Sequence, residues 1–204
     1  MINIVGLGPG NIKLITDKGK VTIAKSDVLI GGKRNLQSLE GMFKGETLEI
    51  GNNLKEILQF IKDNYLDKEI TVVASGDPML YGIGKYLSEQ LEEGSFEIIS
   101  GISATTYMFS QIPMNMNDVY ITSSHGKVPN FPFILAHEKV AMVTDDKIGP
   151  YEIAREIIKR GLNKVMWIGE NLSYDNERIT RLKPEEVLET KSYEMNVVVI
   201  VDEK

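Results

Sequence analysis

The sequence contains no cysteine, and its only histidines are His125 and His137. Without cysteine, the chain has no disulfide bonds, no thiolate metal sites and no cysteine nucleophile. Two histidines are also too few for a histidine-rich metal site. We therefore expect no metal held by the protein.

Long hydrophobic runs and basic tracts are missing as well. An apolar run such as residues 195–201 is far shorter than the roughly 20 residues that span a bilayer. The first five residues (MINIV) are typical of a strand and lack the basic-then-apolar order of a signal peptide. The net charge is -6 and no basic tract exceeds residues 32–34 (GKR), whereas nucleic acid binding requires a basic patch. We therefore expect a cytoplasmic protein that binds neither a membrane nor nucleic acid.

Short apolar runs alternate with segments of helical periodicity along the chain. Such runs are typical of strands buried on both faces of a mostly parallel sheet. They cover residues 2–5, 28–30, 70–74, 96–99, 119–122, 140–144, 164–168 and 196–201. A polar segment, residues 111–118, interrupts the rhythm. The sequence therefore predicts an α/β protein of two domains, 1–113 and 114–204, each an open α/β sheet with flanking helices.

Capping residues predict where several helices begin. Thr16 is the expected cap of the first helix. Asn53, with Glu56 as its capping-box partner, precedes apolar residues at helical spacing. Asp77 is followed by a proline at the first helical position, which is the usual form of a helix start. A further helix is expected over residues 151–159.

A glycine loop, residues 6–10 (GLGPG), directly follows the first predicted strand. Dinucleotide-binding loops place their third glycine three residues after the second, whereas here Gly10 comes two after Gly8. Such loops also open directly into a helix, but here the cap Thr16 comes later. The second strand ends in residues 31–33 (GGK), without the acidic residue that binds ribose. These differences exclude NAD, and they leave open whether the loop binds another ligand or only turns the chain.

Three further loops end apolar runs in the same way. They are residues 75–82 (SGDPMLYG), 100–104 (SGISA) and 123–127 (SSHGK). Ligands of open α/β sheets bind outside the carboxyl ends of the strands. If the first sheet is parallel, its glycine loop and the first two of these loops lie together at one edge, which is then the expected binding site.

The paired motifs GLGPG at residues 6–10 and SGDP at residues 75–78 resemble the signature of the tetrapyrrole methylases. Further segments are similar to the branch of that family that methylates carbon 5 of cobalt-precorrin-7. They are residues 30–34 (IGGKR), 81–84 (YGIG), 124–127 (SHGK), 144–145 (TD), 169–172 (GENL), 177–179 (ERI) and 196–199 (NVVV). The resemblance runs nearly end to end and keeps the order of the motifs.

The resemblance implies a two-domain tetrapyrrole methylase fold, a homodimer and an S-adenosylmethionine-dependent C-methyltransferase of cobalamin biosynthesis that releases S-adenosylhomocysteine. The methyl donor is expected in a trough between the domains. The expected donor-binding residues are Leu7, Gly8, Pro9, Gly76, Asp77, Leu80, Tyr81, Ser103, Ala104 and Thr144. No catalytic base is assigned, because a sulfonium methyl is already reactive and orientation alone can contribute roughly 7–11 kcal/mol.

The expected substrate is a corrinoid tetrapyrrole with many carboxylates. Because the protein is acidic overall, local cations must converge on those carboxylates. The expected substrate-binding residues are Arg34, His125 and Lys127, together with Lys33. The branch also exists fused to a decarboxylating precorrin methyltransferase, and here that partner is expected to be a separate protein.

Four alternatives share parts of this pattern. The first is methylation of another precorrin ring position. The second is diphthine synthase, which shares the fold and acts on a protein. The third is a ribosomal RNA methylase of the same fold, which the acidic charge disfavours. The fourth is a non-catalytic nucleotide-binding module with the same glycine loops and no methyl acceptor.

Overall fold

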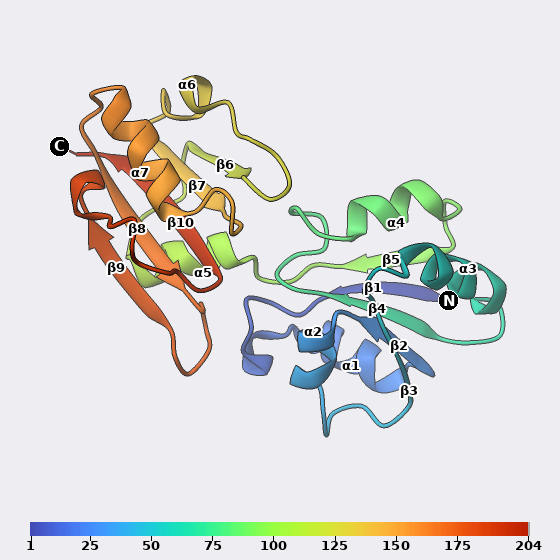
Figure 1. Cartoon of the computed structure of the whole chain (residues 1–204). Coiled ribbons are helices and arrows are strands. Elements are labelled where there is room, and N and C mark those ends of the chain that lie inside the picture. Colours follow the sequence, from blue (N-terminus) through green and yellow to red (C-terminus); the bar gives the residue numbers. More distant parts are fainter. Residues whose placement is uncertain (204) are drawn as a thin grey trace. The chain divides into compact units, whose positions relative to one another are not determined.

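A computed structural model describes residues 1–203, which form two compact units, Met1–Ser103 and a second that begins at Ala104 (Figure 1). The division falls before helix α5 (Ala104–Gln111), whereas the sequence places it after that helix, at 113/114. Helix α5 joins the second unit because Met108 and Phe109 are buried in a cluster with residues of the second sheet. None of the helices formed by residues 1–203 is long and apolar enough to cross a membrane.

The first unit is a parallel sheet of five strands between helices. The strand order is β3-β2-β4-β1-β5, and every neighbouring pair is parallel. The strands are β1 (Ile2–Gly6), β2 (Val28–Gly31), β3 (Glu46–Glu49), β4 (Ile70–Ala74) and β5 (Phe96–Ile99). The helices are η1 (Ile12–Leu14), α1 (Asp17–Lys25), α2 (Lys33–Ser38), α3 (Leu54–Asn64) and α4 (Gly84–Gln90). The parallel sheet predicted from the short apolar runs is confirmed here.

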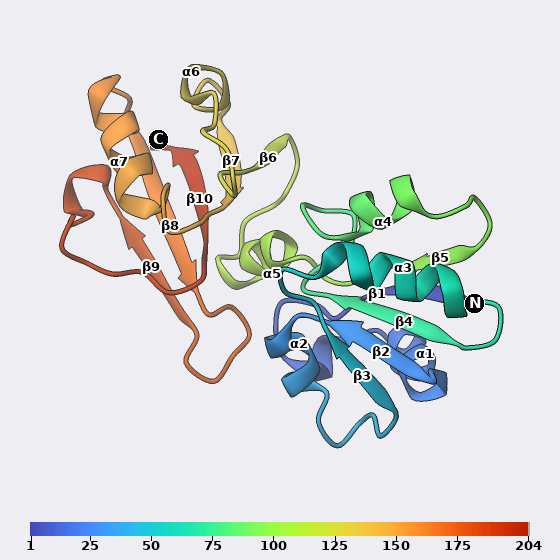
Figure 2. The ribbon, with the colours of Figure 1, turned by 45° about the vertical axis from the view of Figure 1, so that its right-hand side comes forward.

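Both faces of the first sheet are covered, which explains why its central strands are mostly apolar, with Asn3 of β1 and Thr71 of β4 as buried exceptions. Ile57 and Ile61 of α3 and Leu87 of α4 pack on one face. On the other face, Ile23 of α1 and Leu39, which follows α2, complete a second cluster. Figures 1 and 2 show α3 and α4 on one side of this sheet and α1 and α2 on the other.

The second unit contains a mixed sheet of order β6-β7-β10-β8-β9. Only β6 and β7 are parallel, and the other neighbours are antiparallel. The strands are β6 (Val119–Ser123), β7 (Lys139–Val143), β8 (Lys164–Glu170), β9 (Arg178–Leu182) and β10 (Asn196–Asp202). The remaining helices are α6 (Phe131–Ile134), α7 (Pro150–Lys159) and η2 (Pro184–Glu186). The preference for a mostly parallel sheet therefore fails in this unit, because β8 and β9 form a hairpin and β10 is inserted antiparallel between β7 and β8.

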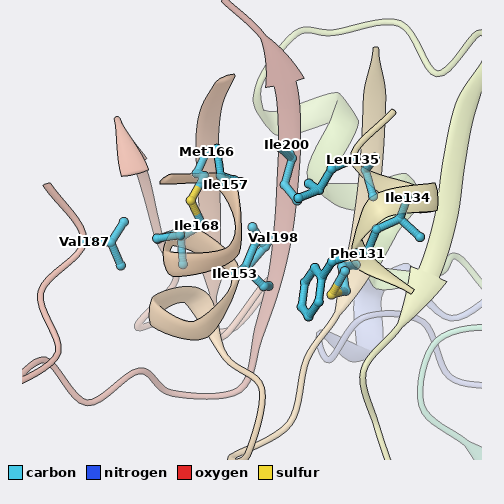
Figure 3. Packing of buried hydrophobic residues seen from close by; sticks show 13 residues of the cluster. Phe131, Ile134, Leu135, Ile153, Ile157, Met166, Ile168, Val187, Val198 and Ile200 are labelled. Carbon is cyan, nitrogen blue, oxygen red and sulfur yellow. The ribbon is translucent and has the colours of Figure 1, made fainter. Parts of the chain in front are cut away.

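The main core of the second unit lies on one face of this sheet. Figure 3 shows Phe131 of α6 and Ile153 and Ile157 of α7 packed against Val198 and other strand residues. The opposite face is covered by α5, whose Met108 and Phe109 are buried there. Each unit thus buries apolar residues on both faces of its own sheet.

The cap at Thr16 is confirmed by its bond from the N–H of Gly19, and α3 begins directly after Asn53 as predicted. The expected helix start at Asp77 is wrong, and the expected capping bond of Asn53 is not formed. Helix α4 begins at Gly84, so Asp77 is not its N-cap. Asn53 precedes α3, but its side chain makes no cap bond and instead accepts from Gly51 and donates to Glu49. Both polar side chains serve tight turns after strands, which compete with helix capping for the same short side chains.

Candidate functional site

Three strand ends meet at one edge of the first unit, because β4, β1 and β5 are parallel neighbours. Their loops approach through Gly6, Gly76 and Gly101. A Cβ atom built on Gly6 would lie 2.5 Å from the Gly101 nitrogen and 2.6 Å from the Gly76 carbonyl oxygen. Only glycine permits main chain to pack on main chain at this distance. The expected gathering of these loops is confirmed.

The glycine loop is bonded directly to the turn after β4. Leu7 N–H donates to the Ala74 carbonyl at 2.8 Å, and Gly8 and Gly76 exchange two main-chain bonds of 3.2 and 2.7 Å. Gly8 and Gly76 have φ angles of 83° and 65°, which glycine adopts without strain. Leu7 and Pro9 are buried, so the loop is a fixed part of the unit rather than a loose connection.

Asp77 ties two of these loops together. Its Oδ1 accepts the N–H of Met79 at 2.8 Å, and its Oδ2 accepts the N–H of Gly101 at 3.3 Å. The remaining expected donor-binding residues of this edge follow on the same loops. Leu80 is half-buried, Tyr81 is half exposed with φ 56°, and Ser103 is buried.

Arg34 lies beside the same turn. It is exposed in the first turn of α2, and its guanidinium donates to Ser75 Oγ at 3.4 Å. Ser75 in turn donates to Asn35 Oδ1 at 2.9 Å. The end of β2 and the end of β4 are therefore linked by side chains, and Arg34 brings a positive charge next to the SGDP turn. Lys33 is exposed on the preceding position.

In the second unit, the loop after β6 lies against the loop after β7. Ser124 N–H donates to the Val143 carbonyl at 2.9 Å, and Ser124 Oγ donates to the Ile148 carbonyl at 2.8 Å. Gly126 N–H donates to Asp145 Oδ2 at 3.1 Å. His125 and Lys127, on either side of Gly126, are both exposed.

Asp145 is held as a carboxylate by its surroundings. Main-chain N–H donors, of Ile148 first and then of Gly126 and Lys147, keep the pKa of Asp145 below its ordinary value. The nearby His125 acts in the same direction, and desolvation acts against it. The folded loops therefore stabilise the ionised form of the Asp145 carboxyl group.

Thr144 is bonded across to the start of β10. Its Oγ1 donates to Asn196 Oδ1 at 2.7 Å, and Asn196 Nδ2 donates to the Glu194 carbonyl at 2.8 Å. A pocket of about 360 Å³ opens beside Thr144 and Asn196. Asp145 and Asp146, the start of α7, and residues 189 and 191–195 form its other walls.

A buried ion pair fixes the same segment from the other side. Glu170, at the end of β8, is 1% exposed and receives two bonds from the Arg178 guanidinium, of 2.8 and 2.6 Å. The N–H of Glu194 also donates to Glu170 Oε1 at 3.2 Å. Burial and the Glu170 charge raise the pKa of the neighbouring Tyr193 phenol. The chain just before β10 is thus anchored to β8 and β9.

The expected site residues fall into two groups. The first unit brings together Leu7, Gly8, Pro9, Gly76, Asp77, Leu80, Tyr81, Ser103 and Arg34. The second unit contains Ala104, as the first residue of α5, and also Thr144, His125 and Lys127.

Sequence reasoning included Gly6, Gly101, Asp145 and Glu170 in its motifs but gave none of them an individual role. The signal for Asp145 was present, since it follows a buried apolar run much as Asp77 does. The close packing at Gly6 and Gly101 was harder to predict, because a glycine that follows a strand can have several structural roles. Their mutual contact is visible only once the strand order is known.

Comparison with known proteins gives one consistent answer. The sequence profile of the Tetrapyrrole (Corrin/Porphyrin) Methylases matches residues 1–188. The chain is 44% identical to a cobalt-precorrin-7 C(5)-methyltransferase of Salmonella typhimurium, over 100% of both chains.

Solved structures agree on the fold. A cobalt precorrin-4 methyltransferase has a TM-score of 0.82 at 21% identity, covering 98% of this chain and 94% of that one. A uroporphyrin-III C-methyl transferase from Thermus thermophilus, complexed with S-adenosyl homocysteine, has a TM-score of 0.80 at 19% identity, covering 98% and 96%.

Proposed function

Because the chain belongs to the tetrapyrrole (corrin/porphyrin) methylases, we propose that it transfers a methyl group from S-adenosylmethionine to carbon 5 of cobalt-precorrin-7. The product is cobalt-precorrin-8, in cobalamin biosynthesis. The observation that carries the proposal is the 44% identity with the Salmonella typhimurium enzyme, without a gap in coverage of either chain. The same similarity favours carbon 5 over another precorrin ring position and over diphthine synthase.

The methyl donor is proposed to bind at the loops that follow β1, β4 and β5 and at Thr144. The residues concerned are Leu7, Gly8, Pro9, Gly76, Asp77, Leu80, Tyr81, Ser103, Ala104 and Thr144. Glycine main chain at a strand edge lets a ligand approach closely, and the Asp77 carboxylate suits a ligand that carries positive charge. S-adenosylmethionine supplies a methyl group on a cationic sulfur, which a nucleophilic carbon can take up directly. The chain's own contribution is then orientation and exclusion of competing water.

The corrinoid substrate is proposed to be held by Arg34, His125 and Lys127. All three are exposed and follow the carboxyl end of a strand, Arg34 in the first turn of α2 and His125 and Lys127 on the loop after β6. Arg34 is placed beside Ser75, close to the donor loops of its own unit. A guanidinium and an ammonium form charge-assisted hydrogen bonds with substrate carboxylates. The cobalt ion belongs to the substrate in this scheme.

Arg34→Ala tests this assignment. We expect weaker binding of cobalt-precorrin-7 and an affinity for S-adenosylhomocysteine close to that of the unaltered protein. Lys44→Ala is the control, because Lys44 is another exposed cation of the first unit outside these loops. Equal weakening of both ligands by Arg34→Ala, or an equal effect of Lys44→Ala, would remove Arg34 from the substrate site.

The assembly and location of the protein are also proposals. We propose a homodimer in the cytoplasm that works beside a separate decarboxylating precorrin methyltransferase. Light scattering after size-exclusion chromatography measures the first point directly. A monomer at micromolar concentration contradicts it.

The decisive experiment has two steps. Calorimetric titration with S-adenosylhomocysteine, with NAD and ATP as controls, tests the donor. Methyl-labelled S-adenosylmethionine with cobalt-precorrin-7 then tests the acceptor, and NMR of the product gives the ring position. Selective donor binding and label at carbon 5 are expected. Label at another carbon, or no donor binding by the folded protein, rejects the proposal.

A further inference from the structure

The same carboxylate arrangement occurs once in each unit. Asp77 follows β4, and Asp145 follows β7. In both, Oδ1 accepts the N–H two residues later, that of Met79 at 2.8 Å and that of Lys147 at 3.0 Å. In both, Oδ2 accepts a glycine N–H from the loop of another strand, with distances of 3.3 Å for Gly101 and 3.1 Å for Gly126. Each aspartate therefore shapes its own turn and also holds a second loop.

The loop held by Asp145 has little packing of its own. Residues 125–128 are all exposed, and a Cβ atom on Gly126 would meet nothing within 4 Å. Hydrogen bonds must therefore fix this loop. Within the loop, His125 N–H donates to Ser123 Oγ and Lys127 N–H donates to the Ser124 carbonyl. Ser124 joins the base of the loop to Val143 and Ile148, and the bond from Gly126 to Asp145 joins its tip to the loop after β7. The tip carries His125 and Lys127, which are the proposed substrate-binding side chains of this unit.

We propose that Asp145 is a positioning residue for methyl transfer, which acts by holding His125 and Lys127 in the orientation that binds the tetrapyrrole. The inference rests on the proposed function, since it assigns Asp145 to the acceptor side of that reaction. Asp145 acts through Gly126 and does not itself contact the substrate. A carboxylate that faced a substrate rich in carboxylates would repel it. The Asp145 carboxylate instead accepts hydrogen bonds from main-chain N–H groups of the protein.

Asp145→Asn separates the two tasks of this side chain. The asparagine Oδ1 can still accept from Lys147 and Ile148, so the turn after β7 is retained. Its Nδ2 is a donor and faces the Gly126 N–H, which is also a donor, so the link to the loop is lost. We expect the KM for cobalt-precorrin-7 to rise about tenfold, as for loss of one bond to a charged group. The dissociation constant of S-adenosylhomocysteine should change less than about twofold, because the bonds of Thr144 go to Asn196 instead.

Asp146→Asn is the matched control. Asp146 is the next residue, it is exposed, and within residues 1–203 its carboxylate has no hydrogen bond or ion pair. The substitution removes the same charge from the same loop, and we expect an unchanged KM. A similar rise in both variants means that local charge, rather than the bond to Gly126, sets substrate affinity, and it overturns the proposal.

A second readout does not depend on catalysis. Amide hydrogen exchange at Gly126 should be faster in Asp145→Asn than in the unaltered protein, with the exchange of β7 unchanged. Asp145→Ser should also show faster exchange at Gly126, because its hydroxyl can still accept from Lys147 but is too short to reach Gly126. It replaces the asparagine variant if that variant folds poorly. An unchanged Gly126 exchange or an unchanged KM overturns the inference.

Failure of the unaltered protein to bind S-adenosylhomocysteine or to methylate instead rejects the proposed function, while the exchange measurement still decides whether Asp145 holds the loop.

Discussion

The two units hold their strand-end loops by opposite means. In the first, Gly6, Gly76 and Gly101 bring main chain against main chain, with no room for a side chain between the loops. In the second, side chains make the links, and Asp145 and Glu170 each gather N–H groups from more than one segment. In both units an aspartate that follows an inner strand holds a second loop, and in the first unit Arg34 and Ser75 add a side-chain link.

Sheet topology explains this difference. Three parallel neighbours, β4, β1 and β5, end at the same edge, so three main chains converge and only glycine fits. In the mixed sheet, the end of β7 meets the start of β10, and the end of β8 meets the starts of β9 and β10. In this unit the side chains of Asp145 and Glu170 make the links between those connections. The first unit should therefore be sensitive to added atoms and the second to removed hydrogen-bond partners.

Gly101→Ala should have the largest effect on stability. The added methyl would lie against the Gly76 carbonyl and 2.7 Å from the Gly6 carbonyl carbon, and main-chain atoms cannot move aside cheaply. We expect a loss of about 3 kcal/mol or more in the free energy of unfolding, at the upper end of overpacking costs. Urea unfolding followed by circular dichroism measures it.

Gly126→Ala is the matched glycine of the second unit. It has φ 71° and open space around its Cβ position, so only the left-handed backbone costs energy. That cost is about 1 kcal/mol. Equal losses for Gly101→Ala and Gly126→Ala would show that crowding of the main chain does not distinguish the two units.

The ion pair of the second unit should respond unequally to loss of its two partners. Arg178→Ala leaves the Glu170 carboxylate buried and without its guanidinium, which is strongly unfavourable. Glu170→Gln leaves an arginine that is 54% exposed and can be solvated, and the glutamine oxygen can still accept from Glu194. We therefore expect Arg178→Ala to lower the urea midpoint more than Glu170→Gln does. The reverse order would mean that Glu170 is reached by water and is not an anchor.

Asp77→Asn and Asp145→Asn compare the two aspartates directly. In Asp77→Asn, the bond from Met79 is retained and the bond from Gly101 is lost, which loosens two of the proposed donor loops. We expect the affinity for S-adenosylhomocysteine to fall roughly tenfold, or about 1.4 kcal/mol. The melting temperature should fall by a similar small amount in the two variants, because each loses one hydrogen bond from a glycine N–H and neither aspartate caps a helix. An effect of Asp77→Asn on the tetrapyrrole alone would contradict this division of roles.

Much of the fold was predictable because buried strands are mostly apolar. All eight apolar runs are strands, and the predicted ends coincide with the observed ones or differ by at most two residues. The edge strands β3 (ETLE) and β9 (RITRL) were not predicted, because they are largely exposed and carry charges like loops do. Helix α5 was not predicted and contains no charged residue, and its membership of the second unit follows only from packing.

The candidate site was predictable where a loop directly follows a strand. The three loops of the first unit were expected at one edge and they meet there. The partners within the site were not predictable, since Asp77 binds Gly101 and Asp145 binds Gly126 across gaps of many residues. Short polar side chains serve helix caps and turns equally well, and only the tertiary structure decides which.

The smallest expected effect is a pH dependence that belongs to Asp145. Its pKa in the folded protein lies below the ordinary value of about 3.9, because main-chain N–H groups bind the charged form. The resulting stabilisation is therefore present above that ordinary pKa and is lost as the pH falls through the lower folded value. The difference in urea midpoint between the unaltered protein and Asp145→Asn should be full at pH 5 and shrink by pH 3. A difference that persists unchanged at pH 3 would mean that shape, rather than the carboxylate charge, lets Asp145 hold the loop, and the contrast with the glycine contacts of the first unit would weaken.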